Sequence, residues 1–202
     1  DYQATTPLDP EVLAAMLPFF GAAFGNAAST GHAWGMRAAE AVATARAQVA
    51  GLIGAPPHAL VFTSGATESI NLALKGLAES AGDRRRQVVP CATEHPAVLD
   101  TCAWLESRGL TVTRLAVDGQ GHLDEAALAG SITEETLCLS LMLANNEVGT
   151  IHPLPRYASL AHAKGAFVHC DGTQAVGKVP VDVDALGIDL LSFSAHKLHG
   201  PK

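Results

Sequence analysis

The segment Leu137-Cys138-Leu139-Ser140-Leu141-Met142-Leu143 is nearly continuous in apolar residues. A β-strand with one face in water alternates apolar and polar side chains, whereas a strand covered on both faces is apolar almost throughout. We therefore predict a buried strand here, within a largely parallel sheet that is covered on both faces. The rest of the chain is interpreted outward from this strand.

Helical and strand-like patterns alternate on both sides of this segment. We expect helices at residues 10–20, 36–53, 67–81, 96–108, 124–131 and 155–164. We expect strands at residues 59–63, 87–90, 110–116, 137–143, 166–170 and 189–193, and a loop at 21–35. This alternation predicts an α/β fold with a mainly parallel sheet.

The composition narrows the class of protein. The 202 residues are 48% hydrophobic and 16% charged, which is enough to bury a sizeable core. A net charge of −7 without a basic stripe argues against nucleic acid as a partner. The one dense basic run, residues 84–86, is expected to be a solvated loop.

Cysteine spacing and hydropathy indicate the compartment. The four cysteines show no CxxC pairing and most lie in apolar runs, so we expect buried free thiols in a reducing compartment. No apolar stretch reaches the length of a membrane span, and no membrane partner is expected. The cytoplasm is therefore the expected location. The cysteines are Cys91, Cys102, Cys138 and Cys170.

Two ionisable residues follow predicted strands near the end of the chain. Asp171 comes directly after strand 166–170, and Lys197 comes shortly after strand 189–193. Ligands of parallel sheets gather at the carboxyl ends of the strands. A buried lysine and aspartate there suit pyridoxal phosphate: the lysine forms a Schiff base, and the carboxylate keeps the pyridine nitrogen protonated. A local helix cap is the alternative role for Asp171.

Residues 63–68, Thr-Ser-Gly-Ala-Thr-Glu, stand between a predicted strand and a predicted helix. Small residues such as Ala66 let backbone N–H groups reach an anion, and the hydroxyls of Ser64 and Thr67 add donors. A phosphate cradle and a plain capping box are equally consistent with this segment. Ser194 and His196 could reach the same phosphate oxygens.

Three further polar positions lie at predicted strand ends. His95 could stack on an aromatic cofactor and move protons, or simply flank its helix. Asn146 could bond a cofactor oxygen, or belong to a turn, and Gln174 could reach the phenolic oxygen of the ring. His169 is expected to pack within its strand. It lacks the repeated spacing of zinc ligands, so no metal site is expected.

Taken together, these motifs resemble the cysteine desulfurase family of fold-type I pyridoxal-phosphate enzymes, in the class V aminotransferase group. Seven matches run in family order along the whole chain. They are Asp1-Tyr2-x-Ala4-Thr5-Thr6-Pro7, Gly25-Asn26-x-x-Ser29, Phe62-Thr63-Ser64-Gly65-Ala66-Thr67-Glu68, Glu94-His95, Asn145-Asn146-Glu147-Val148-Gly149, His169-x-Asp171-x-Thr173-Gln174 and Ser192-Phe193-Ser194-x-His196-Lys197.

The resemblance implies a role for each matched site residue. Lys197 and His95 would be catalytic, through the Schiff base and through ring stacking with proton transfer. Asp171 would pair with the ring nitrogen, and Asn26 would help to bind the substrate carboxylate region. The remaining cofactor contacts would be Ala66, Thr67, Ser194 and His196 at the phosphate, and Asn146 and Gln174 on the O3′ side.

The resemblance also implies a three-layer large domain, a reaction and partners. Residues 16–202 would be the cofactor-binding large domain and residues 1–15 an arm of the small domain. Sulfur would be removed from L-cysteine to give L-alanine and an enzyme persulfide, which supplies a sulfur-acceptor protein in iron–sulfur cluster assembly or thiolation. A homodimer is implied. Selenocysteine lyase, cysteine sulfinate lyase and a non-catalytic subunit of the same fold remain alternatives.

Two departures from the family pattern bear on activity. Ala195 stands where the family usually has glycine. None of the four cysteines matches the family's catalytic loop cysteine, which lies far downstream of the lysine. Since the chain has no initiator Met and stops shortly after a predicted strand, we expect a fragment that lacks the small C-terminal domain and is inactive alone.

Overall fold

The computed structural model describes residues 1–202, which form two compact units. Unit 1 consists of residues 1–62 together with 195–202, and unit 2 of residues 63–194. These boundaries differ from the expected division after residue 15. The assignment of residues 1–15 to a small domain stays a prediction.

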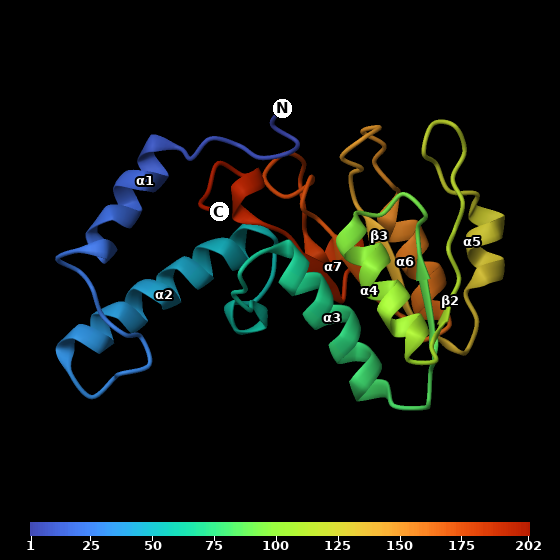
Figure 1. Cartoon of the computed structure of the whole chain (residues 1–202), viewed down its shortest axis with the longest axis horizontal. Coiled ribbons are helices and arrows are strands. Elements are labelled where there is room, and N and C mark those ends of the chain that lie inside the picture. The colour runs from blue at the N-terminus through green and yellow to red at the C-terminus, as the bar shows by residue number, and fades with distance from the viewer. The chain divides into compact units, whose positions relative to one another are not determined.

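A five-stranded sheet forms the centre of unit 2 (Figure 1). Its strands are β1 (Gln87–Pro90), β2 (Thr111–Val112), β3 (Thr136–Met142), β4 (Phe167–Asp171) and β5 (Leu190–Ser192). Their order is β2-β1-β3-β4-β5, and every neighbouring pair is parallel. The prediction of an α/β fold with a parallel sheet is confirmed.

Helices cover both faces of this sheet. They are α3 (Ala66–Ala81), α4 (Pro96–Ser107), α5 (Glu125–Ser131), α6 (Leu154–Ala163) and α7 (Val183–Leu186). The crossover from β1 to β2 runs in one direction along the sheet, whereas those from β3 to β4 and from β4 to β5 run in the other. Right-handed crossovers in opposite directions place their helices on opposite faces. Accordingly, α4 packs with α3, whereas α6 packs with α5 and α7.

The central strand β3 is buried at every position, as its apolar sequence predicts. It pairs with β1 on one side and β4 on the other. A core between this sheet and helices α3 and α4 includes Ile70, Leu74, Val98 and Leu105, each at most 1% exposed. These side chains hold α3 and α4 against the sheet.

The prediction of a strand at residues 59–63 is wrong. Residues Pro57–Ala59 form a 3₁₀ turn, η2, and the extended residues that follow join no sheet. A strand exists only where a neighbouring strand accepts and donates its backbone hydrogen bonds. Here the Leu60 carbonyl is bound by the Arg46 guanidinium, and Val61 and Phe62 are 67% and 51% exposed.

Other boundaries shift for local reasons. The expected helix 10–20 divides into α1 (Pro10–Met16) and the 3₁₀ helix η1 (Leu17–Phe20), because Pro18 cannot donate the next helical hydrogen bond. Asp9 caps α1 as predicted, since its Oδ1 accepts the Glu11 N–H at 2.7 Å. The expected strand 110–116 is reduced to β2 and one isolated bridge between Leu115 and Cys91.

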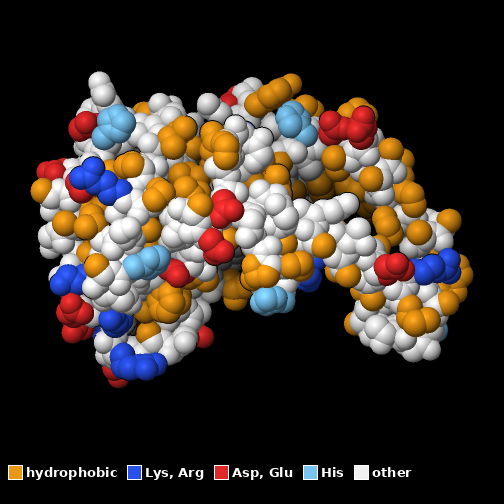
Figure 2. Space-filling model, turned by 180° about the vertical axis from the view of Figure 1, so that it is seen from behind, with side chains coloured by type: hydrophobic (Ala, Val, Ile, Leu, Met, Phe, Trp, Pro, Cys, Tyr) orange, Lys and Arg blue, Asp and Glu red, His pale blue; other side chains and the backbone are white.

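In unit 1, the helix α2 (Ala33–Leu52) starts three residues earlier than predicted, because the His32 side chain caps it through the Gly35 N–H. The chain ends run beside one another: the Thr6 N–H donates to the His196 carbonyl at 2.9 Å. Figure 2 shows hydrophobic side chains on the surface of the molecule. In this unit the exposed large apolar residues include Phe20. No helix of the chain combines the length and the apolar character that crossing a membrane requires.

Candidate functional site

The strand order of unit 2 reverses between β1 and β3, because their crossovers run in opposite directions. In parallel sheets such a reversal opens a crevice at the carboxyl ends of the two strands, where ligands bind. Glu94 and His95 follow β1 there, and Asn145 and Asn146 follow β3. The loops that the sequence motifs marked therefore meet at one edge of the sheet.

Asp171 is the last residue of β4 and is only 2% exposed. It is in register with Met142 on β3 and Ser192 on β5. Its Oδ1 accepts the Thr173 N–H at 2.9 Å, which is the local capping bond that the sequence left as an alternative. The Thr173 hydroxyl is buried beside it and has no hydrogen-bond partner.

His95 is the N-cap of α4, and its ring is exposed. Its Nδ1 accepts the Ala97 N–H at 3.1 Å. A ring nitrogen that accepts a hydrogen bond carries no proton, so in this arrangement the imidazole proton is on Nε2. The cap thus fixes both the tautomer and the orientation of a ring whose other edge faces outward. The helix-flanking role and a ligand-binding role are compatible at this position.

Glu94 is a buried residue to which the sequence assigned no role. It is 5% exposed, and its Oε1 accepts the Met142 N–H at 2.7 Å, whereas its Oε2 is buried without a partner. Desolvation by burial raises the pKa of Glu94 well above its usual value. The Met142 hydrogen bond opposes this shift, and the charge of Asp171 adds to it. An acidic residue in the loop after a buried strand, four residues beyond Pro90, was the available signal.

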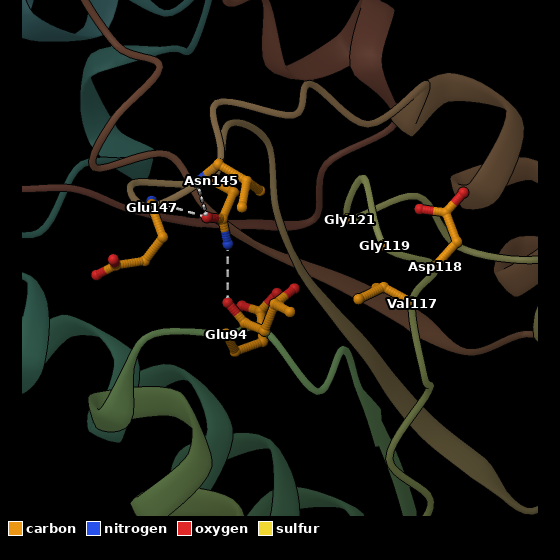
Figure 3. Close-up of a pocket in the computed structure, with 9 residues that line it drawn as sticks. Glu94, Val117, Asp118, Gly119, Gly121, Asn145 and Glu147 are labelled. Carbon is orange, nitrogen blue, oxygen red and sulfur yellow. Dashed lines mark hydrogen bonds between the residues drawn. The ribbon is translucent and has the colours of Figure 1, made fainter.

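The two asparagines after β3 differ in role. The Oδ1 of Asn145 accepts the Glu147 and Val148 N–H groups at 2.8 and 3.1 Å, which forms a turn. Its Nδ2 donates to the Thr93 carbonyl at 2.9 Å, and Figure 3 shows this side chain pointing toward the loop of Glu94. Asn146 is half-buried and donates to Glu147 Oε1 at 3.0 Å. The turn interpretation therefore holds for this segment, since Asn146 lies within the turn that Asn145 closes.

A pocket of about 330 Å³ opens beside these two loops. Figure 3 shows its third wall, a turn after β2 that carries Val117 and Asp118. The complete lining is Thr93, Glu94, Val117, Asp118, Gly119, Gly121, Asn145, Glu147 and Val148. The pocket lies within unit 2, at the strand-order reversal.

The start of α3 lacks a side-chain cap. Its N-cap is Gly65, at a φ of 152° that side chains rarely adopt, so neither Thr63 nor Ser64 caps the helix. Half of the expected capping box remains, because Glu68 Oε2 accepts the Ser64 N–H at 2.5 Å. The Ser194 Oγ lies 3.8 Å from the place that a Cβ at Gly65 would take. The hydroxyl and the first turn of α3, with Ala66 and Thr67, are thus brought together.

His169 packs inside its strand, as predicted. Its Nδ1 is 2.8 Å from the Ser140 hydroxyl, and its Nε2 is 3.1 Å from the Ser192 hydroxyl. The Ser69 hydroxyl of α3 lies 2.9 Å from the same Ser192 hydroxyl. Desolvation lowers the pKa of His169 to about 4, although Asp171 acts in the opposite direction. Gln174 is 8% exposed, and its Oε1 accepts the Lys178 ammonium at 2.5 Å.

Three of the sequence-predicted site residues belong to unit 1. Lys197 and His196 lie in the 3₁₀ helix η3 (Ala195–Lys197). The Lys197 ammonium donates to the Gln3 carbonyl, and His196 Nδ1 is 3.1 Å from the Thr5 hydroxyl. Asn26 is exposed, and its Oδ1 accepts the Ala28 N–H at 2.9 Å.

The other predicted residues all belong to unit 2: Ala66, Thr67, His95, Asn146, Asp171, Gln174 and Ser194. Of these, the structure brings Ser194 to the start of α3, and it sets Asp171, His95 and Asn146 at strand ends on one edge of the sheet. The assembly of both sets into one site stays a prediction.

The four cysteines are free and buried, as the sequence predicts. Desolvation raises the pKa of Cys102 and of Cys138 to about 12, and raises the pKa of Cys91 and Cys170 as well. A thiol acts as a nucleophile through its thiolate. None of these cysteines is therefore suited to nucleophilic attack near neutral pH.

Comparison with known proteins gives a consistent family. The family model described as aminotransferase class-V matches residues 1–202. The chain is 50% identical over 202 residues to a protein of Anaeromyxobacter sp. (strain Fw109-5) named "Cysteine desulfurase IscS", and 48% identical to one of that name from Rickettsia bellii (strain OSU 85-389). The matches cover all of this chain but 50% and 49% of those relatives, so the chain spans about half their length.

Solved structures agree with this result. A structure titled "NIFS-LIKE PROTEIN" superposes with a TM-score of 0.97 at 40% identity, over the whole of this chain and 56% of the other. One titled "SspA in complex with cysteine" gives a TM-score of 0.95 at 37% identity, over the whole of this chain and 58% of the other. Because the family match extends along the whole chain and the fold is shared, this chain belongs to the aminotransferase class-V family.

Proposed function

We propose that this protein is a cysteine desulfurase that uses pyridoxal phosphate. It takes sulfur from L-cysteine, releases L-alanine and passes the sulfur as a persulfide to an acceptor protein in iron–sulfur cluster assembly or thiolation. The names of the relatives and the cysteine complex of a similar structure support this substrate. The observation that carries the proposal is the buried carboxylate of Asp171 at the end of β4.

The residues around Asp171 fit the cofactor. A buried carboxylate needs a hydrogen-bonding or charged partner, which a protonated pyridine nitrogen supplies. The buried Thr173 hydroxyl beside it has no hydrogen-bond partner. At the start of α3, the uncapped first turn and the Ser194 hydroxyl offer donors that suit a phosphate.

When bound, pyridoxal phosphate withdraws electrons from the amino-acid substrate. In the proposed site, Asp171 would hold the proton on the ring nitrogen, and Lys197 would supply the amine that binds the cofactor covalently. The exposed ring of His95 would stack on the cofactor, and its Nε2 would exchange protons. The phosphate contacts are assigned to Ala66, Thr67, Ser194 and His196, the O3′ contacts to Asn146 and Gln174, and the substrate carboxylate region to Asn26.

The thiolate that accepts sulfur is proposed to lie outside residues 1–202. The four cysteines here are buried, and their raised pKa values keep them as neutral thiols. Burial also keeps a substrate sulfur out of their reach. We further propose a homodimer that works in the cytoplasm, in line with the resemblance.

The test is the Asp171→Ala variant of the full-length protein. With L-cysteine, pyridoxal phosphate and a thiol reductant that cleaves the persulfide, such as dithiothreitol, the wild type is expected to form alanine and sulfide in equal amounts. Loss of the charge partner should lower turnover by at least on the order of a hundredfold, because the electron-withdrawing state of the ring loses its electrostatic support. The matched variant Asp171→Asn keeps the shape without the charge.

Two results would count against the proposal. Turnover unchanged in Asp171→Ala would remove Asp171 from its assigned role. A wild-type protein that shows no alanine formation and no visible absorbance with pyridoxal phosphate would favour the non-catalytic alternative.

A further inference from the structure

Glu94 connects two loops that the proposed function uses separately. Its neighbour in sequence, His95, is the exposed ring at the start of α4. Its carboxyl oxygen Oε1 accepts the N–H of Met142 at 2.7 Å, and Met142 is the β3 residue in register with Asp171. Glu94 is therefore one residue from His95 and one hydrogen bond from the strand position beside Asp171.

The Glu94 carboxyl replaces a missing strand at this point. The Cys91 N–H donates to the Ser140 carbonyl at 3.3 Å, which is the last backbone bond between the β1 segment and β3. Two residues further along β3, the Met142 N–H points to the same side, because N–H groups alternate along a strand. With β1 already ended at Pro90, that buried donor has the Glu94 side chain as its acceptor.

The surroundings of Glu94 suit such a structural bond. Four titratable groups interact electrostatically with Glu94. They are Asp171 and Cys170 of β4, Cys102 of α4, and Cys91. The thiols are neutral, and no cation is among these groups. Burial raises the pKa of Glu94 well above its usual value.

We propose that Glu94 is a positioning residue, which holds the loop that carries His95 against the strand ends that carry Asp171. This inference rests on the proposed function, in which those two residues contact the ring of the cofactor from different directions. A second link, from Asn145 Nδ2 to the Thr93 carbonyl at 2.9 Å, keeps the same loop attached when the Glu94 bond is removed. Removal of the Glu94 side chain is thus expected to loosen the loop without unfolding the unit.

The experiment compares Glu94→Ala and Glu94→Gln in the full-length protein. The glutamine retains a neutral carbonyl oxygen that can accept the Met142 N–H, whereas the alanine does not. The matched control is Glu106→Ala, which removes an exposed carboxylate from α4, the helix that follows Glu94. Three quantities are measured: the dissociation constant for pyridoxal phosphate, the visible circular dichroism of the bound cofactor, and amide hydrogen exchange without cofactor.

Glu94→Ala is expected to weaken cofactor binding and to speed exchange of the Met142 amide, each on the order of tenfold, which is the loss of one buried hydrogen bond. It should also lower the circular dichroism per bound cofactor, because the ring is held less firmly. Glu94→Gln should restore all three, and Glu106→Ala should leave them at the wild-type values. The Leu139 amide of the same strand reports any general loss of stability.

The inference would be overturned if Glu94→Ala kept the cofactor affinity and circular dichroism of the wild type. It would also be overturned if Glu94→Gln bound the cofactor no more tightly than Glu94→Ala. Unchanged Met142 exchange in Glu94→Ala would overturn the link itself. A wild-type protein that binds no pyridoxal phosphate would contradict the proposed function and the cofactor role of Glu94 together. The Met142 exchange is measured without cofactor. It therefore tests the Glu94–Met142 hydrogen bond even if the protein binds no pyridoxal phosphate.

Discussion

Helices α2 and α3 are both long, at 20 and 16 residues, yet they bury very different surfaces. In α3 the side chains of Ile70 and Leu74 are at most 1% exposed, because they face the sheet and α4. In α2 the buried residues are small ones, Gly35, Ala38 and Ala50. Apolar spacing marks the face of a helix that can be buried, but only a partner surface buries it.

The same contrast separates the two sets of proposed site residues. Asp171 and Ser194 are buried in unit 2 at the ends of paired strands. Lys197 belongs to unit 1, in a single 3₁₀ turn beside the N-terminal segment. The buried sheet of unit 2 fixes the residue that is assigned to hold charge, whereas a short turn carries the residue that is assigned to bond covalently.

The largest expected effect concerns Lys197. Lys197→Ala in the full-length protein should abolish covalent attachment of pyridoxal phosphate, because no other amine replaces the assigned one. Reduction with borohydride followed by mass spectrometry measures the attachment. Lys202→Ala, a change in the same unit, should keep it. An adduct that persists in Lys197→Ala would show that another lysine is used.

Truncating one apolar side chain in each unit tests the difference in burial directly. Leu139→Ala, in fully buried β3, should reduce the free energy of unfolding by about 2–5 kcal/mol. Val42→Ala in α2, where the side chain is 40% exposed, should change it by less than about 0.5 kcal/mol. Urea denaturation of the full-length protein followed by circular dichroism measures both. Equal losses would mean that α2 is packed as firmly as β3.

Acid should act through the buried His169 of unit 2. Its folded pKa is lowered to about 4, so the unfolded state binds the additional proton. Stability from this group is therefore complete above about pH 6.5 and is lost as the pH falls toward about 4, a change of roughly 3 kcal/mol. Unfolding measured from pH 7 to pH 4 should show this slope, and His169→Gln should lack it. The same slope in the variant would assign the effect to other groups.

The smallest expected effect compares two helix caps. Asp124 accepts the Ala126 N–H at 2.9 Å at the start of α5, whose Leu128 is fully buried. Asp124→Ala should reduce the free energy of unfolding by about 1 kcal/mol. Asp9→Ala at α1, a helix with no buried residue, should lower the local helix content and leave the main unfolding transition unchanged. A shift of equal size from both caps would contradict the distinction.

Prediction from sequence succeeded where the signal was local. The apolar run at 137–143 gave a buried central strand, and the polar residues after each strand marked one edge of the sheet. It failed at residues 59–63, where apolar side chains had no strand to pair with. It also gave Glu94 no role, since the partner of that carboxyl, Met142, is far along the chain.

The sequence by itself determined the α/β alternation, the burial of β3 and the family-order motifs that mark the site, because each depends on neighbouring residues or on fixed spacing. Only the tertiary structure decided that Gly65 rather than a hydroxyl side chain begins α3, and that Glu94 closes the β3 ladder where β1 ends. It also decided which apolar helix faces are covered. These features depend on which distant groups meet, and on whether a buried donor or apolar surface finds a partner there.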